Sequence, residues 1–295
     1  MTCAGRFDFH EPQWCPGCGN FDVLTCIKEA LCGLEMEPQN FIMVTGIGQA
    51  SKLGFSVKCN LFNGLHGRAL PVATGINMAN HKVKLISVSG DGDYYSEGGN
   101  HFIHAARRNL NIAVFAGDNR VYGLTKGQAS PTSPPEFVTP IHPGGVGGKP
   151  LNPAFLALAS GATFVARAFS GNKPELTGLM RQAITHKGFA LVDIMSPCVT
   201  FNKINTFAWF RARVKPVGSD HDPSDFDAAV GLVSRGQEEI PTGLIYKADR
   251  PAFNARFAAL NGVERSDTIQ EQEAIALRSA AYAPERVRSL FKQFK

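Results

Sequence analysis

The segment KLISVSGDGDYYSEGGN, residues 84–100, joins an apolar strand-like run to a glycine- and aspartate-rich loop and then to a helical pattern. Glycines let backbone N–H groups come close to a ligand, and the helix that begins near Gly98 favours an anion at its start. A helix end supplies only about 0.3–1 kcal/mol toward an anion, and the two aspartates of the loop would repel a phosphate. A divalent cation that neutralises Asp91 and bridges phosphate oxygens resolves both problems.

Strand-like and helix-like segments alternate on both sides of this loop, from about residue 20 to residue 196. The further strand candidates are Phe41–Gly46, Asn111–Asp118, Thr163–Phe169 and Phe189–Met195. Apolar residues at three-to-four spacing predict helices at Phe21–Met36, Ala69–His81, Asn100–Arg108, Asn152–Ser160 and Lys173–Thr185. Continuous apolar strands separated by helices predict an α/β fold, a parallel sheet with helices on both faces. Ligands of such sheets bind at the carboxyl ends of the strands.

The composition is that of a globular protein: 44% of the 295 residues are hydrophobic, 19% are charged, and the formal net charge is +5. Disordered and collagen-like proteins are excluded. No stretch is apolar enough to span a membrane, and the N-terminus has no apolar signal core, which predicts a cytoplasmic protein.

We expect one catalytic domain over residues 1–199 and a C-terminal extension over residues 200–295 that packs on this domain or on another subunit. The extension holds a strand candidate at Thr242–Asp249 and a charged C-terminal helix. The segment from Gly123 to Pro150 is rich in proline and glycine, and loops of that length are more often functional or covered by a partner than idle.

A second polar motif, Gly117-Asp118-Asn119, follows 25 residues after Gly92 at the end of another strand. Because the ends of parallel strands meet at one edge, an acid from one strand and an amide from the other can share a ligand. With a backbone carbonyl they supply three oxygens to an octahedral Mg²⁺, and phosphate oxygens and water complete the six.

These two motifs together resemble the thiamine-diphosphate signature, a GDG sequence followed after about 25 residues by an asparagine pair. The pair usually reads Asn-Asn, whereas this chain has Asp118-Asn119. The resemblance implies that Asp91 and Asn119 bind Mg²⁺ through their side chains and that Val121 binds it through its carbonyl oxygen.

Cys15 and Cys18 form a C-x₂-C pair directly before a predicted helix. Such a pair alone is compatible with a zinc knuckle, a redox pair or an iron–sulfur site. Cys59 and Cys198 are the candidates for completing ligands, and four thiolates suit either Zn²⁺ or a [4Fe–4S] cluster.

The remaining cysteines are not expected to bind a metal or a cluster. Cys26 and Cys32 fall within a helical pattern, where a cysteine is ordinarily a small buried apolar residue. Cys3 is expected to lie in a loosely held terminus.

Six motifs in this order resemble the β subunit of the 2-oxoacid:ferredoxin oxidoreductases, in particular the 2-oxoglutarate type. They are WCPGCG at 14–19, GIG at 46–48, NGLHGRALPVATG at 63–75, GDGD at 90–93, YGLTKGQ-x-SPTS at 122–133 and SPC at 196–198. The resemblance covers about residues 10–205. It implies thiamine diphosphate, Mg²⁺ and a [4Fe–4S] cluster as cofactors, and the oxidative decarboxylation of a 2-oxoacid with coenzyme A and ferredoxin, or its reverse.

The chain departs from this family at one position. The family commonly has cysteine directly after GIG as a cluster ligand, and here the residue is Gln49. A neutral amide is a poor iron ligand beside thiolates, so we predict that Cys59 replaces it. The predicted cluster ligands are then Cys15, Cys18, Cys59 and Cys198.

The resemblance also implies a site shared with a second chain. Thiamine enzymes use a glutamate on the aminopyrimidine ring, and we expect an α subunit to supply it in an αβ or α₂β₂ assembly. The cofactor-binding residues implied by the motifs are Gly46, Ile47, Gly48, His66, Gly90, Asp91, Gly92, Asp93, Asn119, Val121, Tyr122, Gly123, Leu124 and Thr125.

The candidate catalytic and substrate-contacting residues are the cationic groups near the predicted site, His66, Arg68 and Lys126. Pyruvate offers one carboxylate, whereas 2-oxoglutarate needs a second cationic contact. A pyruvate or broad 2-oxoacid specificity is the alternative.

Two other functions are compatible with these residues. One is a non-redox thiamine decarboxylase or carboligase with a zinc knuckle in place of a cluster. The other is a zinc-knuckle module that binds nucleic acid, suggested by the sequence pI of about 8.8. The chain has no basic run or aromatic stripe to support the latter, so no nucleic-acid partner is expected.

Overall fold

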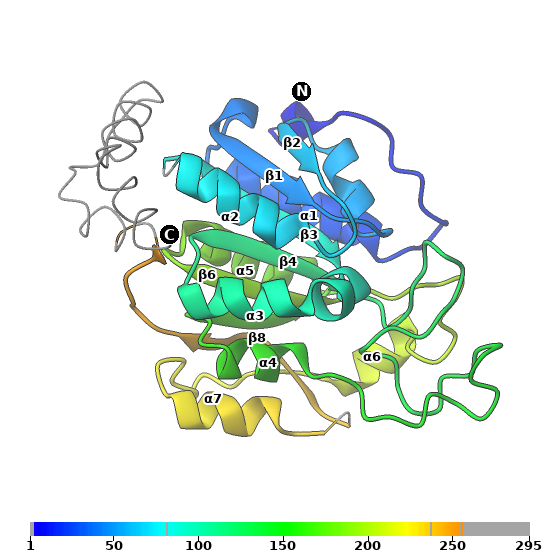
Figure 1. The fold of residues 1–295 in the computed structure, drawn as a ribbon. Coiled ribbons are helices and arrows are strands. Elements are labelled where there is room, and N and C mark those ends of the chain that lie inside the picture. Colours follow the sequence, from blue (N-terminus) through cyan, green and yellow to red (C-terminus); the bar gives the residue numbers. More distant parts are fainter. Residues whose placement is uncertain (1–2, 81, 237, 254, 256–295) are drawn as a thin grey trace, which may run out of the picture.

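The computed structural model describes residues 3–80, 82–236, 238–253 and 255, which form a mixed sheet covered by helices (Figure 1). Within this part of the chain the sheet has eight strands in the order β2-β1-β3-β4-β6-β5-β8-β7. The strands are β1 Phe41–Thr45, β2 Asn60–Asn63, β3 Lys84–Gly90, β4 Ile112–Asp118, β5 Phe164–Phe169, β6 Phe189–Met195, β7 Val214–Pro216 and β8 Ile240–Lys247. Neighbouring strands pair in parallel except β5 and β8. The predicted α/β sheet is confirmed and is mostly parallel: β8, and β7 that pairs in parallel with it, run antiparallel to the other strands.

Alternate residues of the strands enter two separate cores. Phe41 and Met43 of β1 lie in the core beneath α1 Asn20–Gly33 and α5 Lys173–Thr185, whereas Val44 lies in the core on the other face. That second face is covered by α2 Ala69–Ala79, α3 Gly99–Arg108, α4 Pro153–Ala159 and α7 Phe226–Val233 (Figure 1). Successive side chains of a strand point to opposite faces of the sheet, and both faces of this sheet are buried. The strands are therefore near-continuous apolar runs and do not alternate between apolar and polar residues.

The five strands and five helices predicted from the apolar patterns are all present. The strand β2 was not predicted because it is a short edge strand with mostly exposed residues, so no apolar run marks it. The segment 123–150 contains no named helix or strand, as expected for its composition.

The C-terminal extension adds to the same sheet. After α6 Phe207–Arg213, the strands β7 and β8 attach through β8 to β5. The predicted strand at Thr242–Asp249 is confirmed as β8, while the predicted C-terminal helix lies outside the described residues. The boundary between residues 199 and 200 stays a prediction. Within the described residues, no helix is long and apolar enough to cross a membrane.

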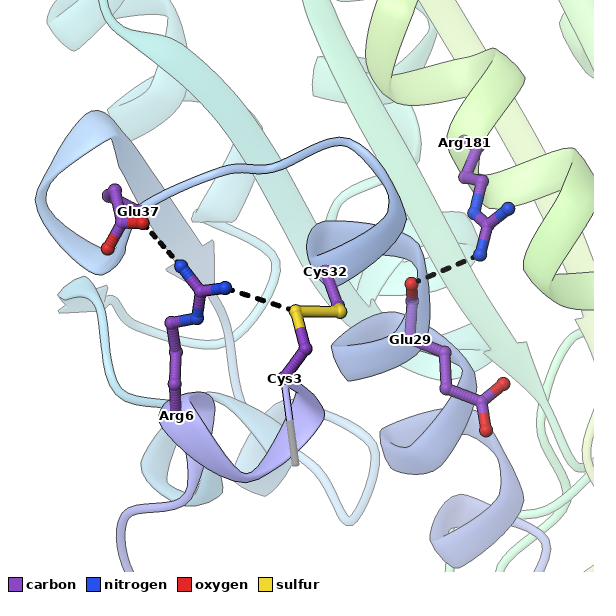
Figure 2. The surroundings of a disulfide bond; sticks show 6 residues. All are labelled: Cys3, Arg6, Glu29, Cys32, Glu37 and Arg181. Carbon is purple, nitrogen blue, oxygen red and sulfur yellow. Dashed lines mark hydrogen bonds and ion pairs between the residues drawn. A yellow bond between two sulfur atoms is a disulfide. The ribbon is translucent and has the colours of Figure 1, made fainter. Parts of the chain in front are cut away.

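A disulfide joins the N-terminal segment to the C-terminal end of α1. This corrects the expectation for two cysteines. Cys3 and Cys32 form a disulfide with their Cα atoms 5.7 Å apart (Figure 2). Beside it, Arg6 donates to the Cys3 sulfur at 3.1 Å and forms an ion pair with Glu37. Helix α1 brings the chain back to the N-terminal segment, so that Cys32 meets Cys3. Cys3 is therefore not in a loosely held terminus, and Cys32 is a disulfide partner and not simply a small apolar residue. Cys26 is fully buried, as predicted.

Asn109, at the end of α3, joins three elements. It adopts the left-handed conformation, φ 58°, that ends a helix. Its Oδ1 accepts from the Phe189 backbone N–H at 2.8 Å and from the Thr163 hydroxyl at 2.7 Å. Its Nδ2 donates to the carbonyl oxygen of Arg250 at 2.9 Å.

We expect Asn109→Ala to lower the free energy of unfolding by about 2–4 kcal/mol, because a buried donor and acceptor lose their partners and alanine tolerates φ > 0 poorly. Urea unfolding followed by circular dichroism measures it. Asn100→Ala, at an exposed position of the same helix, is the control and should change the value by no more than about 0.5 kcal/mol. Equal effects of the two substitutions would contradict this role for Asn109.

Candidate functional site

The two polar motifs lie side by side at the carboxyl ends of β3 and β4. Gly90 and Gly117 are directly paired in the parallel register, so Asp91 and Asp118 leave adjacent strands at the same level. The loops that carry the two motifs open onto a cavity that also receives the loop after β1. The lining residues are Ile47, Gly48, Gln49, Ala50, His66, Gly90, Asp91, Gly92, Asp93, Asn119, Val121, Tyr122, Gly123, Leu124 and Thr125. The structure thus brings together all the predicted cofactor-binding residues except Gly46.

Asp91 and Asp118 form a buried acidic pair bridged by one hydroxyl. The Thr132 Oγ1 lies 2.7 Å from the Asp91 carboxylate and 2.7 Å from that of Asp118. A hydroxyl carries one proton, so it donates to one carboxylate at a time. Burial, together with the nearby Asp118, raises the pKa of Asp91 to about 8. A buried acid beside a second acid is an arrangement that a cation stabilises.

Thr132 was not among the predicted site residues, although the SPTS motif contains it. Nothing in its local sequence indicates this contact, since the loop from residue 123 must fold back across the strand ends to reach Asp91.

Asp93 binds protein groups on both carboxylate oxygens. Its Oδ1 accepts from the backbone N–H groups of Ile47 at 2.9 Å and Gly67 at 2.8 Å, and its Oδ2 accepts from the Ser89 hydroxyl at 2.6 Å. A Cβ at Gly46 would lie 2.1 Å from Asp93 Oδ2, so only glycine fits there. Asp93 and Gly46 therefore shape the wall of the cavity.

His66 is the one candidate catalytic residue that reaches the cavity. Its Nδ1 lies 2.7 Å from Asp93 Oδ1, and its Nε2 lies 3.5 Å from the Glu97 carboxylate. The other two candidates do not line the cavity. Arg68 donates to the carbonyl oxygen of Glu97 at 3.1 Å, and Lys126 is exposed on the adjoining turn with φ 76°.

Asn119 and Val121 both line the cavity because the residue between them reverses the chain. Arg120 has a left-handed φ of 59° and places its guanidinium 5.1 Å from the ring centre of Trp209, away from the cavity. The Asn119 side-chain oxygen accepts from the Val121 N–H at 3.0 Å. Asn202 donates to the Asn119 carbonyl oxygen at 3.1 Å, which holds the turn in place.

A second cavity adjoins the first and contains three of the four predicted thiol ligands. Its lining residues are Gln13, Trp14, Cys15, Cys18, Asn20, Gln49, Asn119, Gly123, Cys198, Val199, Thr200 and Phe201. Burial raises the pKa of Cys18 to about 11, and the neighbouring thiols of Cys198 and Cys15 add to the effect. Within the described residues, no three His, Cys, Asp or Glu side chains are close enough together to hold a metal ion.

Cys59 does not reach this cavity. It directly precedes β2, whose first residue Asn60 pairs with Ile42 near the amino end of β1, and its sulfur accepts a hydrogen bond from the Met43 backbone. The cavity lies beyond the opposite, carboxyl end of β1. The prediction of Cys59 as the replacement ligand therefore fails on geometry, because a strand parallel to β1 must start at the amino end of the sheet.

The fold and the site agree with two family models. Residues 46–194 match the C-terminal TPP-binding domain of thiamine pyrophosphate enzymes, and residues 198–262 match the C-terminal part of the pyruvate ferredoxin oxidoreductase beta subunit. The first match defines the class of the domain as thiamine pyrophosphate-dependent.

Individual relatives narrow the class to a family. The chain is 41% identical to the beta subunit of 2-oxoacid:ferredoxin oxidoreductase 2 from Aeropyrum pernix, over 83% of each chain. It is 44% identical to the 2-oxoglutarate oxidoreductase subunit KorB of Mycobacterium tuberculosis, over 65% of this chain and 52% of that one. A solved structure, the 2-oxoglutarate:ferredoxin oxidoreductase from Magnetococcus marinus with 2-oxoglutarate, coenzyme A and succinyl-CoA bound, matches with a TM-score of 0.87 at 39% identity, covering 94% of this chain and 96% of that chain. The chain belongs to the β subunits of the 2-oxoacid:ferredoxin oxidoreductases.

We expect Asp93→Asn to lower the free energy of unfolding by about 2–4 kcal/mol. The neutral amide loses the charge that strengthens the bonds from the Ile47 and Gly67 N–H groups to Oδ1, and its NH₂ replaces the oxygen that accepts from the Ser89 hydroxyl. Denaturant unfolding of the purified protein measures the change. Glu97→Gln, at a partly exposed carboxylate of the same segment, is the matched control and should cost less than about 1 kcal/mol. A smaller effect at Asp93 than at Glu97 would show that the carboxylate does not hold the loops together.

Proposed function

We propose that the chain is the β subunit of an enzyme acting on 2-oxoglutarate. The reaction converts 2-oxoglutarate, coenzyme A and two oxidised ferredoxins to succinyl-CoA, CO₂, two reduced ferredoxins and a proton, and it runs in either direction. The observation that carries the proposal is the adjacency of the two cavities, one with the paired diphosphate motifs and the other with three thiols, which share Gln49, Asn119 and Gly123. The ligands named for the Magnetococcus marinus structure support the choice of substrate.

The first cavity fits thiamine diphosphate with Mg²⁺. The buried carboxylate of Asp91 lies next to Asp118, and its hydrogen-bond donors are neutral groups, the Thr132 and Ser130 side chains and the Gly92 backbone. A divalent cation would bring the positive charge that these donors lack. Asp91, Asn119 and the Val121 carbonyl would hold the ion. Thiamine diphosphate, when bound, supplies the carbanion chemistry of decarboxylation.

The chain's own contribution to the chemistry begins with His66. Asp93 accepts only from a protonated Nδ1, so it sets the tautomer in which Nε2 is the free nitrogen. This leaves Nε2, beside Glu97, able to take or return a proton at the cavity. Tyr122 donates to Glu97 at 3.0 Å and so keeps that carboxylate at the rim.

The second cavity fits an iron–sulfur cluster at three positions. Cys15, Cys18 and Cys198 are thiols, the ligand type that iron–sulfur clusters require, and they line the same cavity. Binding would require the thiols to lose their protons, which burial opposes at Cys18, so the metal must compensate that cost. A [4Fe–4S] cluster supplies one-electron acceptance next to the thiamine site.

Exposed apolar residues beside His66 and on the 123–150 loop support an α subunit that covers the site in an αβ or α₂β₂ assembly. Leu65 is 77% exposed beside His66, and Val138 and Ile141 of the 123–150 loop are 62% and 74% exposed. Large exposed apolar side chains, here beside His66 and on the loop that begins at Gly123, are typical of an interface. We further assign residues 1–199 to the catalytic domain and 200–295 to its extension, and place the enzyme in the cytoplasm with ferredoxin and coenzyme A.

A pyruvate or broad 2-oxoacid specificity is the second candidate. It is favoured by the match of residues 198–262 to a pyruvate ferredoxin oxidoreductase beta subunit.

We expect Asp91→Asn to weaken thiamine diphosphate binding at least tenfold, because an amide replaces the only charged oxygen donor of the proposed Mg²⁺ set. Isothermal titration of the αβ complex with thiamine diphosphate and Mg²⁺ gives the affinity. Asp220→Asn, at an exposed loop position, is the control and should bind as the natural protein does. Unchanged affinity of the Asp91 variant would contradict the assignment of Asp91 as a ligand of Mg²⁺.

We expect Lys126→Ala to raise the KM for 2-oxoglutarate about tenfold and to leave the KM for pyruvate nearly unchanged. Lys126 directly follows Thr125, which lines the cavity, so its ammonium can contact the second carboxylate of the longer substrate. Steady-state reduction of a viologen acceptor with each oxoacid measures both constants, and Lys149→Ala in the same loop is the control. Equal changes for the two substrates would place Lys126 elsewhere.

A further inference from the structure

We propose that Gln49 occupies the fourth corner of the iron–sulfur site, so that the cluster is held by three thiolates and one of its irons is labile. This inference rests on the proposed function, which puts a cluster in the thiol-lined cavity, and it concerns the coordination of that cluster. The thiolates come from Cys15, Cys18 and Cys198.

The first observation is that none of the other cysteines lines this cavity. All seven cysteines of the chain are described. Cys3 and Cys32 are joined in a disulfide at the far end of α1, and Cys26 is buried in α1 with its sulfur donating to the Lys173 carbonyl oxygen at 3.7 Å. Cys59 lies at the amino end of β1 and β2. Three thiols are therefore all that this chain offers at the cavity.

The second observation is the position of Gln49. A Cβ built on Gly123 would lie 3.7 Å from the Gln49 Cγ and 3.8 Å from the Cys198 sulfur, so these two side chains face the same point of the cavity. The Gln49 backbone is held there, because its carbonyl oxygen accepts from the Trp14 indole N–H at 2.9 Å. Trp14 itself directly precedes Cys15, so the pair of thiols and the glutamine are tied together.

The third observation is that the Gln49 side-chain oxygen is buried without a hydrogen-bond partner. An unsatisfied buried amide oxygen costs about 1–3 kcal/mol, and an acceptor-only oxygen is satisfied by a donor or by a Lewis acid. An iron at the fourth corner is such an acid. Cys15, Cys18 and Cys198, which line the same cavity, would hold the other corners.

A neutral amide holds iron more weakly than a thiolate does, which makes the corner at Gln49 the one from which iron is lost. With a one-electron oxidant of the ferricyanide class, the step is [4Fe–4S]²⁺ → [3Fe–4S]⁺ + Fe²⁺ + e⁻, with the electron passing to ferricyanide. The bond between this iron and the amide oxygen breaks, and so do its three bonds to cluster sulfides. The three thiolate bonds remain.

The experiment uses the αβ complex purified without oxygen, in the natural form and as Gln49→Cys, Cys59→Ser and Cys198→Ser. Iron and sulfide are counted before and after ferricyanide treatment, and the oxidised samples are examined by electron paramagnetic resonance. We expect the natural complex and Cys59→Ser to lose about one iron in four from the cluster of each β chain and to develop a [3Fe–4S]⁺ signal. Gln49→Cys should keep its iron and stay silent, and Cys198→Ser should lose the cluster.

Three outcomes would overturn the inference while the proposed function stands, provided that iron is present and the natural complex reduces viologen with 2-oxoglutarate. They are loss of the cluster in Cys59→Ser, retention of all iron by the oxidised natural complex, and identical iron loss in the natural complex and Gln49→Cys. If the natural complex contains zinc and no iron and does not reduce viologen, the proposed function fails and the inference fails with it.

Discussion

The buried carboxylate of Asp93 is the constraint on which the candidate site depends. It accepts hydrogen bonds from the N–H groups of Ile47 and Gly67 and from Ser89, so it joins the segments that follow β1, β2 and β3. A buried carboxylate is stable only when such donors surround it, and the donors are placed only when those segments adopt this one arrangement. One wall of the cofactor cavity, and the orientation of His66 against it, therefore form with the fold itself.

The second consequence of this arrangement is that two chemically different cavities share a wall. Gln49, Asn119 and Gly123 line both, and each lies just beyond the carboxyl end of β1 or β4. In the proposed function, electrons released at the thiamine site cross only this wall to reach the thiol-lined cavity. Gln49 then lies on this path as well as beside the proposed cluster.

The motifs contain nearly all of the residues that line the first cavity, because local sequence and parallel-sheet topology carry that information together. Gly90-Asp91-Gly92 and Asn119 each follow an apolar strand, and parallel strands bring such ends to one edge. The same reasoning missed Thr132, whose loop folds back to contact Asp91, and it gave Gln49 no place in the cavity that this residue lines. It was wrong for Cys59, because nearness to Gln49 along the chain was taken for nearness in space, although η3 Ser51–Ser56 carries the chain back to the amino end of the sheet.

The sequence by itself determined the class of fold, the strand ends that bear the site and the family to which the chain belongs, because these depend on periodic apolar patterns and short contiguous motifs. Only the tertiary structure decided which cysteines meet: Cys15, Cys18 and Cys198 at one cavity, Cys3 with Cys32 at the end of α1, and Cys59 apart from both. It also decided that Asp93 holds the loops after β1 and β2, and that His66 alone of the three candidate catalytic residues lines the cavity. These are contacts between residues distant in the chain, and they are set by how helices and loops pack against the sheet, which no local pattern encodes.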